Sequence, residues 1–387
     1  MTADAPALLE LGQRLTREIL APMKRDFIGK DEIVDLLGVC LVAGENLFIL
    51  GPPGTAKSAL VHSLGRRLGG GTFDYLLTRF TEPSELFGPF DIRRLREGEL
   101  VTNTEGMLPE ASMVFLDELL NANSAILNSL LMALNERIFR RGRETRPLRA
   151  LLFVGASNHL PEDDALRALF DRFLMRVHCG PVPAERLGEV LEAGWRLEAG
   201  GISASTIGFD DLQQLRALIG RVNLGAVRAP YLELIGRLRA AGIVVSDRRA
   251  VRLQRMMAAS ALLCGRLDAR RSDLWVLRFI WDREEQSEVI AELVRHTLKQ
   301  EAADTHLDHP RAHADGEPDA EAMAGELAAM TRQLDEAAPD EAALANLHDR
   351  LGLLDGRCQW VRNAEARHFL AGRVAALWSR LSNGATV

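Results

Sequence analysis

The sequence predicts an α/β fold with a parallel sheet in its first half and helices alone in its second half. Short apolar runs alternate with helical patterns up to about residue 180, which is typical of a parallel sheet with helices on its faces. Beyond a Pro-Val-Pro break at residues 181–183 the pattern is helical. A chain of 387 residues also exceeds what one hydrophobic core holds, about 250–300 residues, so several domains are expected.

Three apolar runs in the first half are expected to be buried strands, at residues 46–50, 113–116 and 151–156. Each run ends in polar residues, where the ligands of open α/β sheets normally bind. Residues 58–68 and 125–138 carry apolar side chains at helical spacing and predict helices.

Two insertions are expected to be β-hairpins. Residues 139–147 are short, glycine-centred and rich in arginine, with Arg140, Arg141, Arg143 and Arg146. These arginines either grip nucleic acid or an acidic peptide, or form an ordinary solvated turn. Residues 87–109 follow a predicted helix and contain an alternating stretch with glycines at its turns.

The second half divides into an all-α lobe and a C-terminal helical region. A polar, acidic linker is expected near residues 302–320. Beyond it, apolar stripes at 323–334, 344–354 and 370–381 predict a helical hairpin or small bundle. The expected domains are residues 1–180, 181–283 and 284–387.

Composition bounds the class of protein. The chain is 47% hydrophobic and 26% charged, as in an ordinary globular protein. Only 5% of the residues are aromatic and the net charge is -7, which argues against a dedicated nucleic-acid binder. Four separated cysteines without a CxxC pair indicate buried thiols in a reducing compartment. Since no run is long enough to span a membrane and no signal-peptide pattern is present, we expect a cytoplasmic protein.

The most informative motif is a glycine-rich run between a predicted strand and a predicted helix, Gly51-Pro52-Pro53-Gly54-Thr55-Ala56-Lys57-Ser58. A phosphate-binding loop needs converging backbone N–H groups, a helix N-terminus, one lysine and one hydroxyl. The two glycines permit close approach, Lys57 can reach the β- and γ-phosphates of ATP, and Ser58 can ligate Mg²⁺. The strict pattern has glycine in place of Ala56, and alanine is the smallest substitute. A chance glycine-rich turn is the alternative.

Two carboxylates, Asp117 and Glu118, follow the second predicted strand. In a nucleotide site the first holds Mg²⁺ and the second polarises an attacking water. A pair of this kind is otherwise an N-cap or a solvated turn. Its place about sixty residues after the loop, on a buried strand, favours the nucleotide site. Hydrolysis, as distinct from binding, depends on Glu118.

Four further polar residues each have two interpretations. Asn158 ends the third strand and either orients water or completes a turn. Arg172 either stabilises the transferring phosphoryl group, within the molecule or from a neighbour, or is an ordinary surface arginine. The same two possibilities hold for Arg248 and Arg249, which open a helix of the second lobe.

Taken in order, these motifs resemble the AAA+ ATPases of the MoxR family, and within it the RavA-like branch, from about residue 10 to 283. The run at 51–58 resembles the Walker A motif of the family, including its alanine before the lysine, and VFLDE at 114–118 resembles Walker B. The resemblance implies that Asn158 is the sensor-1 residue and Arg172 an arginine finger. It implies that Arg248 or Arg249 is sensor 2, acting in its own subunit or in a neighbour. It also implies that Ile28 lines the adenine pocket.

The resemblance further implies an αβα core with a helical lid, and hairpins inserted in the second helix and before sensor 1. Members assemble as homo-oligomeric rings, commonly hexamers, with ATP between subunits. ATP hydrolysis with Mg²⁺ would then drive remodelling or activation of a partner, either a client protein or one with a von Willebrand factor A (vWA) domain. The chain departs from the RavA-like pattern at 284–387, where only a helical portion is present.

Two other functions remain open. A nucleic-acid motor or restriction-type ATPase would use the arginine hairpin as a pore loop, and the acidic balance of the chain argues against it. An ATP-gated interaction scaffold would act through the C-terminal helices.

Overall fold

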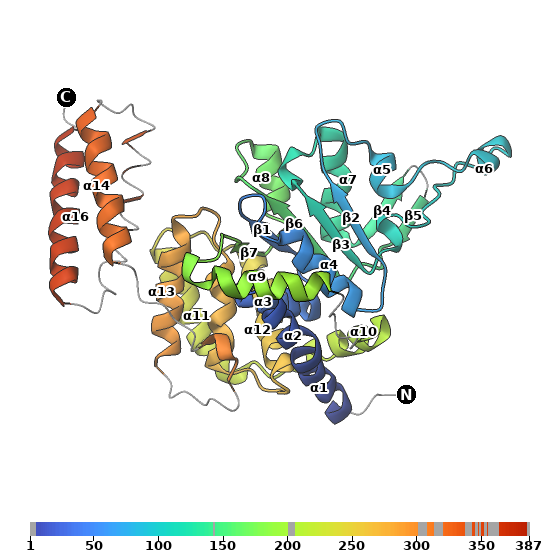
Figure 1. Ribbon diagram of the computed structural model, residues 1–387, viewed down its shortest axis with the longest axis horizontal. Coiled ribbons are helices and arrows are strands. Elements are labelled where there is room, and N and C mark those ends of the chain that lie inside the picture. The colour runs from blue at the N-terminus through green and yellow to red at the C-terminus, as the bar shows by residue number, and fades with distance from the viewer. Residues whose placement is uncertain are drawn as a thin grey trace.

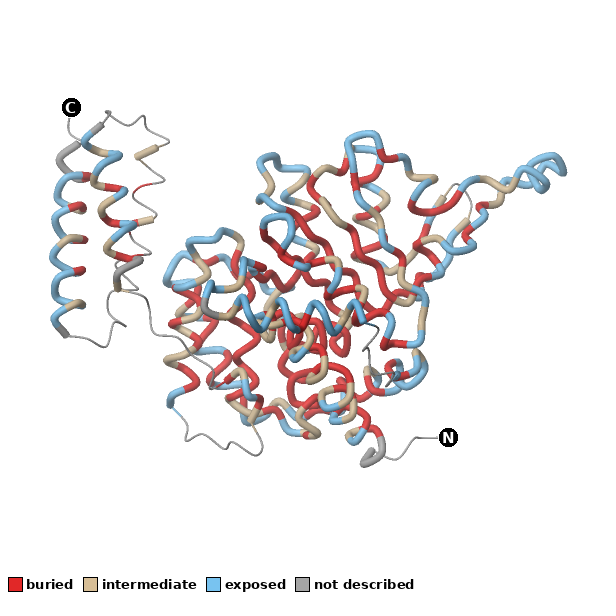
Figure 2. Tube along the Cα trace, viewed as in Figure 1, coloured by how far each residue is buried: buried red, intermediate tan, exposed pale blue. Residues whose placement is uncertain are grey.

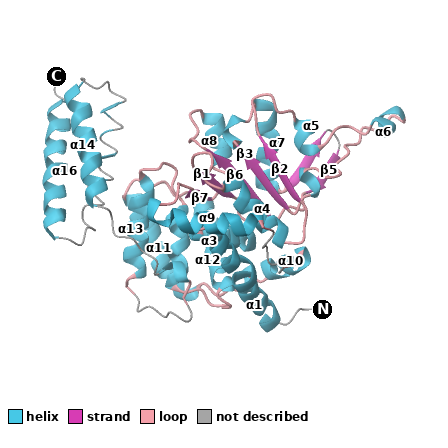
Figure 3. Cartoon of the chain, viewed as in Figure 1, coloured by secondary structure: helices cyan, strands magenta, loops and turns pink. Residues whose placement is uncertain are grey.

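The computed structural model describes residues 5–141, 144–199, 206–300, 308–312, 320–336 and 364–384, with 343–344, 347, 350–351 and 354. The strands gather in one part of the molecule and helices make up the rest (Figure 3). The strands are β1 (Leu47–Leu50), β2 (Thr72–Leu76), β3 (Met113–Asp117), β4 (Ile138–Arg141), β5 (Glu144–Pro147), β6 (Leu152–Ser157) and β7 (Met175–His178).

Helices precede, connect and follow these strands (Figure 1). Those up to the last strand are α1 (Ala5–Arg14), the π-helical η1 (Leu15–Leu20), α2 (Ala21–Asp26), α3 (Asp31–Ala43), α4 (Lys57–Arg67), α5 (Pro83–Phe87), α6 (Ile92–Arg96), η2 (Leu108–Glu110), η3 (Leu119–Asn121), α7 (Ser124–Glu136) and α8 (Asp164–Phe170). Those after it are η4 (Ala184–Arg186), α9 (Leu187–Glu198), α10 (Phe209–Ala217), η5 (Ile219–Arg221), α11 (Gly225–Ala240), α12 (Asp247–Leu263), η6 (Arg271–Phe279), α13 (Gln286–Leu298), η7 (Pro310–Ala312), α14 (Ala320–Glu336) and α16 (Ala364–Gly384).

Five parallel strands form the sheet, in the order β2-β3-β6-β1-β7. The three predicted strands are its centre, and they are continuous apolar runs because both faces of the sheet are covered (Figure 2). The edge strands were not predicted. In β2 only Phe73 is buried, and in β7 an arginine, Arg176, interrupts the apolar run. The predicted α/β fold with a parallel sheet and a helical lid is confirmed.

The two insertions differ in structure. The predicted hairpin at 139–147 is formed by β4 and β5, which pair antiparallel with Phe139 opposite Arg146; Gly142 and Arg143 lie outside the described residues. The prediction of a second β-hairpin at residues 87–109 is wrong, because these residues do not form two paired strands. A single antiparallel bridge joins Phe90 to Thr102, and helix α6 occupies the projecting tip (Figure 1).

The cause of this difference is a helix cap. The side chain of Asp91 accepts hydrogen bonds from the backbone N–H groups of Arg93 and Arg94. This N-cap satisfies donors that a helix start otherwise leaves unpaired, and it stabilises a helical turn where alternation had predicted a strand.

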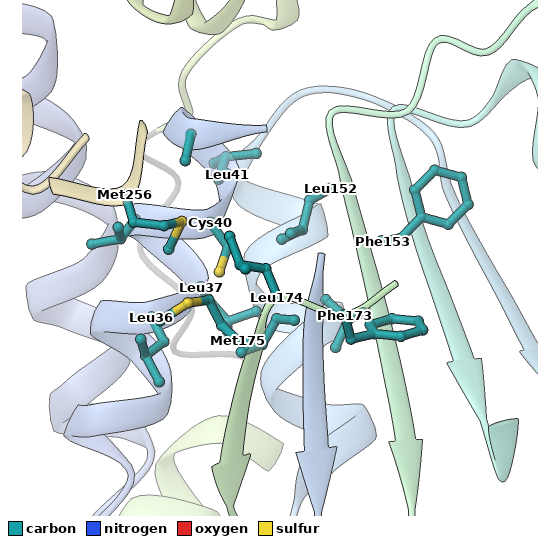
Figure 4. Packing of buried hydrophobic residues seen from close by; sticks show 14 of the residues in the cluster. Leu36, Leu37, Cys40, Leu41, Leu152, Phe153, Phe173, Leu174, Met175 and Met256 are labelled. Atoms are coloured by element: carbon teal, nitrogen blue, oxygen red, sulfur yellow. The ribbon is translucent and has the colours of Figure 1, made fainter. Parts of the chain in front are cut away.

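The helical lobe packs directly on the core. One hydrophobic cluster extends from α1 to α13. In Figure 4, Met256 of α12 lies beside Cys40 and Leu36 of α3, and α3 in turn faces Met175 and Leu152 of the sheet. Helix α3 therefore links the sheet to α12.

The C-terminal helices α14 and α16 form a second cluster, together with Leu347, Leu351 and Leu354. The apolar stripes predicted at 323–334 and 370–381 lie in this cluster. Of the predicted linker at 302–320, the structure describes only 308–312 and Ala320. Among the helices of the described residues, none combines the length and the apolar composition that a membrane span needs.

Candidate nucleotide site

The glycine-rich run forms the loop between β1 and α4, called here the phosphate loop (residues 51–58). A Cβ atom at Gly51 would lie 2.2 Å from the carbonyl oxygen of Cys179, so only glycine fits there. Gly54 has a positive φ of 79° and open space where a Cβ atom would stand. The backbone of this loop is therefore free to approach a ligand closely.

Lys57 is the first residue of α4 and its side chain is only 6% exposed. Its ammonium donates to the carbonyl oxygens of Gly51 and Pro52, at 2.7 and 2.9 Å. A buried cation held by neutral carbonyls, at a helix N-terminus, fits an anionic ligand such as phosphate.

Ala56 has φ 69° and ψ 22°, the left-handed conformation that glycine adopts without strain. For other residues this conformation costs roughly 1–2 kcal/mol. In the described part of the chain, only Ala56, Glu118 and Arg137 are non-glycine residues with positive φ. Two of these three belong to the predicted site, in agreement with the tendency of backbone strain to gather at functional sites.

Asp117 ends β3 and faces the start of α4. Its Oδ2 lies 3.4 Å from the hydroxyl of Ser58, and its Oδ1 accepts from the backbone N–H of Glu118 at 3.0 Å. A hydroxyl beside a carboxylate is a set of hard oxygen ligands, which Mg²⁺ prefers. The half-buried Glu118 follows with a φ of 48°.

Asn158 follows β6, which lies between β3 and β1 in the sheet. Leu50 pairs with Ser157, so Asn158 lies at the same edge as the phosphate loop. Its side chain is exposed. The fold thus brings Asn158 to the sheet edge that carries the phosphate loop and the two carboxylates.

The turn at 27–29 lies beside the chain that leaves β7. The ammonium of Lys30 donates to the carbonyl oxygen of Gly180, and a Cβ atom at Gly29 would lie 3.5 Å from Val182. Since Gly51 lies against Cys179, the phosphate loop and the turn that contains the half-buried Ile28 both adjoin the chain that leaves β7.

The predicted arginines lie elsewhere, around a cavity of about 250 Å³ that no residue of the phosphate loop lines. We call it the arginine pocket. Its charged lining consists of Arg172, Arg176, Arg248, Arg249, Arg252, Asp171 and Asp282. The structure therefore brings Arg172 together with Arg248 and Arg249, but not with the phosphate loop of the same chain.

Asp282 neutralises part of this pocket. Arg176 is fully buried, pairs with Asp282 and donates to the carbonyl oxygen of Trp281 at 2.8 Å; burial lowers its pKa to about 10. Arg249 Nη1 lies 3.0 and 3.1 Å from the two oxygens of Asp282. Arg248 is exposed, and among the described residues its side chain has neither an ion pair nor a hydrogen bond.

The sequence did not single out Arg176 or Asp282, which organise the arginine pocket. The sequence did carry a signal for both residues. Arg176 lies inside the apolar run of β7 and Asp282 follows the apolar pair Ile280-Trp281, and a charged residue in such a place needs a partner.

Comparisons with known proteins agree with this architecture. A family model described as the MoxR domain in the MoxR-vWA-beta-propeller ternary systems matches residues 13–217, and an AAA lid domain model matches residues 227–294. An uncharacterized protein of Methanocaldococcus jannaschii is 33% identical over 271 residues, 69% of this chain and 70% of its own length. A second from the same organism is 34% identical over 260 residues, 67% of this chain and 69% of its own.

Two further comparisons are more distant. Chaperone MoxR1 of Mycobacterium tuberculosis is 28% identical over 168 residues, covering 42% of this chain and 44% of that protein. The crystal structure of a putative ATPase from Cytophaga hutchinsonii superposes with a TM-score of 0.62 at 18% identity, over 77% of this chain and 98% of that one. At this identity the superposition shows a common fold.

Proposed function

Because the chain belongs to the MoxR family of AAA+ ATPases, we propose that it is a ring-forming ATPase that couples ATP hydrolysis to the remodelling or activation of a partner protein. The RavA-like branch stays a prediction, since the matching model is described by systems with vWA and β-propeller components.

The observation that carries this proposal is the meeting of Lys57, Ser58, Asp117 and Glu118 at one edge of the sheet. Backbone N–H groups of the phosphate loop and the Lys57 ammonium would bind the phosphates of ATP. Ser58 and Asp117 would hold Mg²⁺, which supplies positive charge against the phosphate oxygens. Ile28 would contact the adenine.

Hydrolysis requires a group that accepts a proton from water. Glu118 is a half-buried carboxylate beside the proposed metal ligand Asp117. Its left-handed backbone conformation, with a φ of 48°, ends the extended backbone of β3. We assign it as the general base, with Asn158 orienting the water from the adjacent strand.

Arg172 and Arg248 act, in this proposal, on the nucleotide of a neighbouring subunit. They share a pocket that contains no residue of their own phosphate loop, and Asp282 leaves this pocket with an excess of positive charge. A head-to-tail contact gives a closed ring when its rotation returns to the starting subunit. We propose a hexamer, with each site built from two subunits.

The partner we propose is a protein with a vWA domain. The description of the matching family model supports this choice, because it names MoxR-vWA-beta-propeller ternary systems. The similarity to a protein named as a chaperone supports a remodelling role.

The test of the catalytic assignment is Glu118→Gln. The variant keeps the size of the side chain but accepts no proton, so ATP affinity should stay within about twofold while turnover falls by roughly 100-fold or more. Nucleotide binding by titration and phosphate release measure the two effects. Glu198→Gln, an exposed change at the end of α9, is the matched control and should hydrolyse normally. Normal turnover by Glu118→Gln would remove Glu118 from the mechanism.

The same variant also tests the partner class. Held in its ATP-bound state, Glu118→Gln should retain a vWA protein in a pull-down from its own organism, and Lys57→Ala should not. Equal recovery with both variants would contradict a nucleotide-dependent partner.

A further inference from the structure

Two buried polar residues stand directly before β1, at the opposite end of that strand from the phosphate loop. Glu45 is 4% exposed and Asn46 is fully buried. Burial of a carboxylate or an amide is costly unless partners compensate it. The partners of these two residues therefore indicate what they do.

Asn46 holds the backbone of the predicted arginine finger. Its Nδ2 donates to the carbonyl oxygens of Arg172 at 2.9 Å and Leu134 at 3.5 Å, and its Oδ1 accepts from Arg137 Nη2 at 2.7 Å. This orientation of the amide is required, because a carbonyl can only accept and a guanidinium can only donate. Asn46 thus fixes where the chain at Arg172 lies.

Glu45 holds the helix that carries the predicted sensor-2 arginines. It forms an ion pair with Arg252 of α12, and its Oε1 lies 3.9 Å from Arg255 Nε. Arg255 also donates to the carbonyl oxygen of Ala43 at 2.9 Å. Arg252 lines the arginine pocket, one helical turn after Arg248. Glu45 thus connects the first turns of α12 to the start of β1.

Glu45 is also the carboxylate around which four arginines gather. Besides Arg252 and Arg255, its charge acts on Arg137 and Arg216, whose pKa values burial lowers to about 10. Loss of the carboxylate would leave these cations facing one another in a partly buried region, where they repel. A neutral residue at position 45 should therefore displace α12.

We propose that Glu45 and Asn46 are positioning residues that set Arg172 and Arg248 for action on the nucleotide of the next subunit. The inference rests on the proposed function, because it requires those arginines to act between subunits. In this proposal, β1 links the two half-sites of one chain. The phosphate loop follows its C-terminal end, and Glu45 and Asn46, which support the arginine pocket, precede its N-terminal end.

The experiment uses Glu45→Gln and Asn46→Ala in the full chain. Each should lower ATP turnover by roughly tenfold or more, since small displacements of positioned groups are costly, and leave ATP affinity within about twofold. Each variant is then mixed with Glu118→Gln. A Glu118→Gln subunit hydrolyses little ATP itself but presents an intact arginine pocket to its neighbour. The turnover of the mixture should therefore exceed the sum of the turnovers of its two components.

Two controls make the outcomes distinct. Arg172→Ala mixed with Glu118→Gln should show the same gain. Asp273→Asn removes another buried carboxylate, the partner of Arg266 at 2.9 Å, away from the arginine pocket, and should show no gain on mixing. Glu45→Gln keeps the side-chain size, so it carries the test if Asn46→Ala does not fold.

A gain with Arg172→Ala but none with Glu45→Gln and Asn46→Ala would overturn the positioning role and leave the ring proposal intact. No gain with any variant would overturn the action between subunits, and with it this inference.

Discussion

At the scale of single residues, some arginines of this chain form ion pairs within the fold and others do not. Arg176 and Arg249 share Asp282, and Arg67 of α4 is buried against Asp26 at 2.9 Å. Arg248 is exposed without such a partner among the described residues. A guanidinium already engaged in the fold is less free to reach a phosphate, which distinguishes Arg248 from its neighbour Arg249.

This difference predicts opposite results for two adjacent substitutions. Arg248→Ala should lower turnover while leaving the thermal midpoint unchanged, because its side chain forms no ion pair or hydrogen bond with any residue that the structure describes. Arg249→Ala should lower the free energy of unfolding by about 1–3 kcal/mol, because it removes the two contacts with Asp282. Thermal unfolding and steady-state ATPase assays of both variants measure the effects. A fully active Arg248→Ala would exclude it as the sensor-2 residue.

At the scale of elements, the short segment at 308–312 fastens the chain after α13 to the core. The His309 ring stacks on Trp275, with centroids 4.5 Å apart, and Arg311 Nε donates to Asp35 of α3 at 2.7 Å. Lys24 of α2 pairs with the same carboxylate at 2.5 Å. The segment therefore joins η6 to α3, and Asp35 carries the connection on to Lys24 of α2, on the other side of the turn that contains Ile28.

The segment should weaken in acid through His309. Burial lowers the pKa of His309 to about 4, with Lys24, Arg311 and Arg266 acting in the same direction and Asp35 against it. The unfolded chain, with a pKa near 6.5, binds the proton first, so the contribution of this group is complete above pH 6.5 and is lost as the pH falls toward 4. The loss amounts to roughly 3 kcal/mol at pH 4.

His309→Leu provides the measurement. The variant keeps an apolar contact with Trp275 but cannot titrate, so its thermal midpoint should fall less than that of the wild type between pH 7 and pH 4.5. Parallel curves for the two proteins would show that His309 does not control the acid response.

At the scale of the whole molecule, the described residues form two hydrophobic clusters with no member in common. One extends from α1 to α13 and includes Ala312, and the other contains α14 and α16. The ATPase core thus has its own apolar interior, and the C-terminal helices have another.

This separation predicts the effect of truncation. A chain ending at residue 319 should bind nucleotide and unfold near the wild-type midpoint, because it retains the whole first cluster. A chain ending at residue 300 also loses His309 and Arg311 and should unfold at a lower temperature. Loss of nucleotide binding in the longer truncation would show that the core depends on the C-terminal helices.

The sequence predicted elements best where local pattern and burial coincide. Strands β1, β3 and β6 are apolar because helices cover both faces of the sheet, and α7 shows its buried stripe at helical spacing. The edge strands β2 and β7 were not predicted, because β2 has one buried residue and Arg176 interrupts the apolar run of β7. Helix α6 was not predicted, because the helix cap formed by Asp91 determines the local structure although the residues alternate weakly between apolar and polar.

The sequence by itself determined the phosphate loop and the carboxylates after β3, because each is a local run whose chemistry depends on neighbours in the chain. Only the tertiary structure decided that Arg172 and Arg248 share a pocket apart from that loop. The contacts that place them, from Asn46 to Arg172 and from Glu45 to Arg252, join residues 126 and 207 positions apart. Such contacts depend on how strands and helices pack, and a buried carboxylate or amide in the sequence does not show which distant group will compensate it.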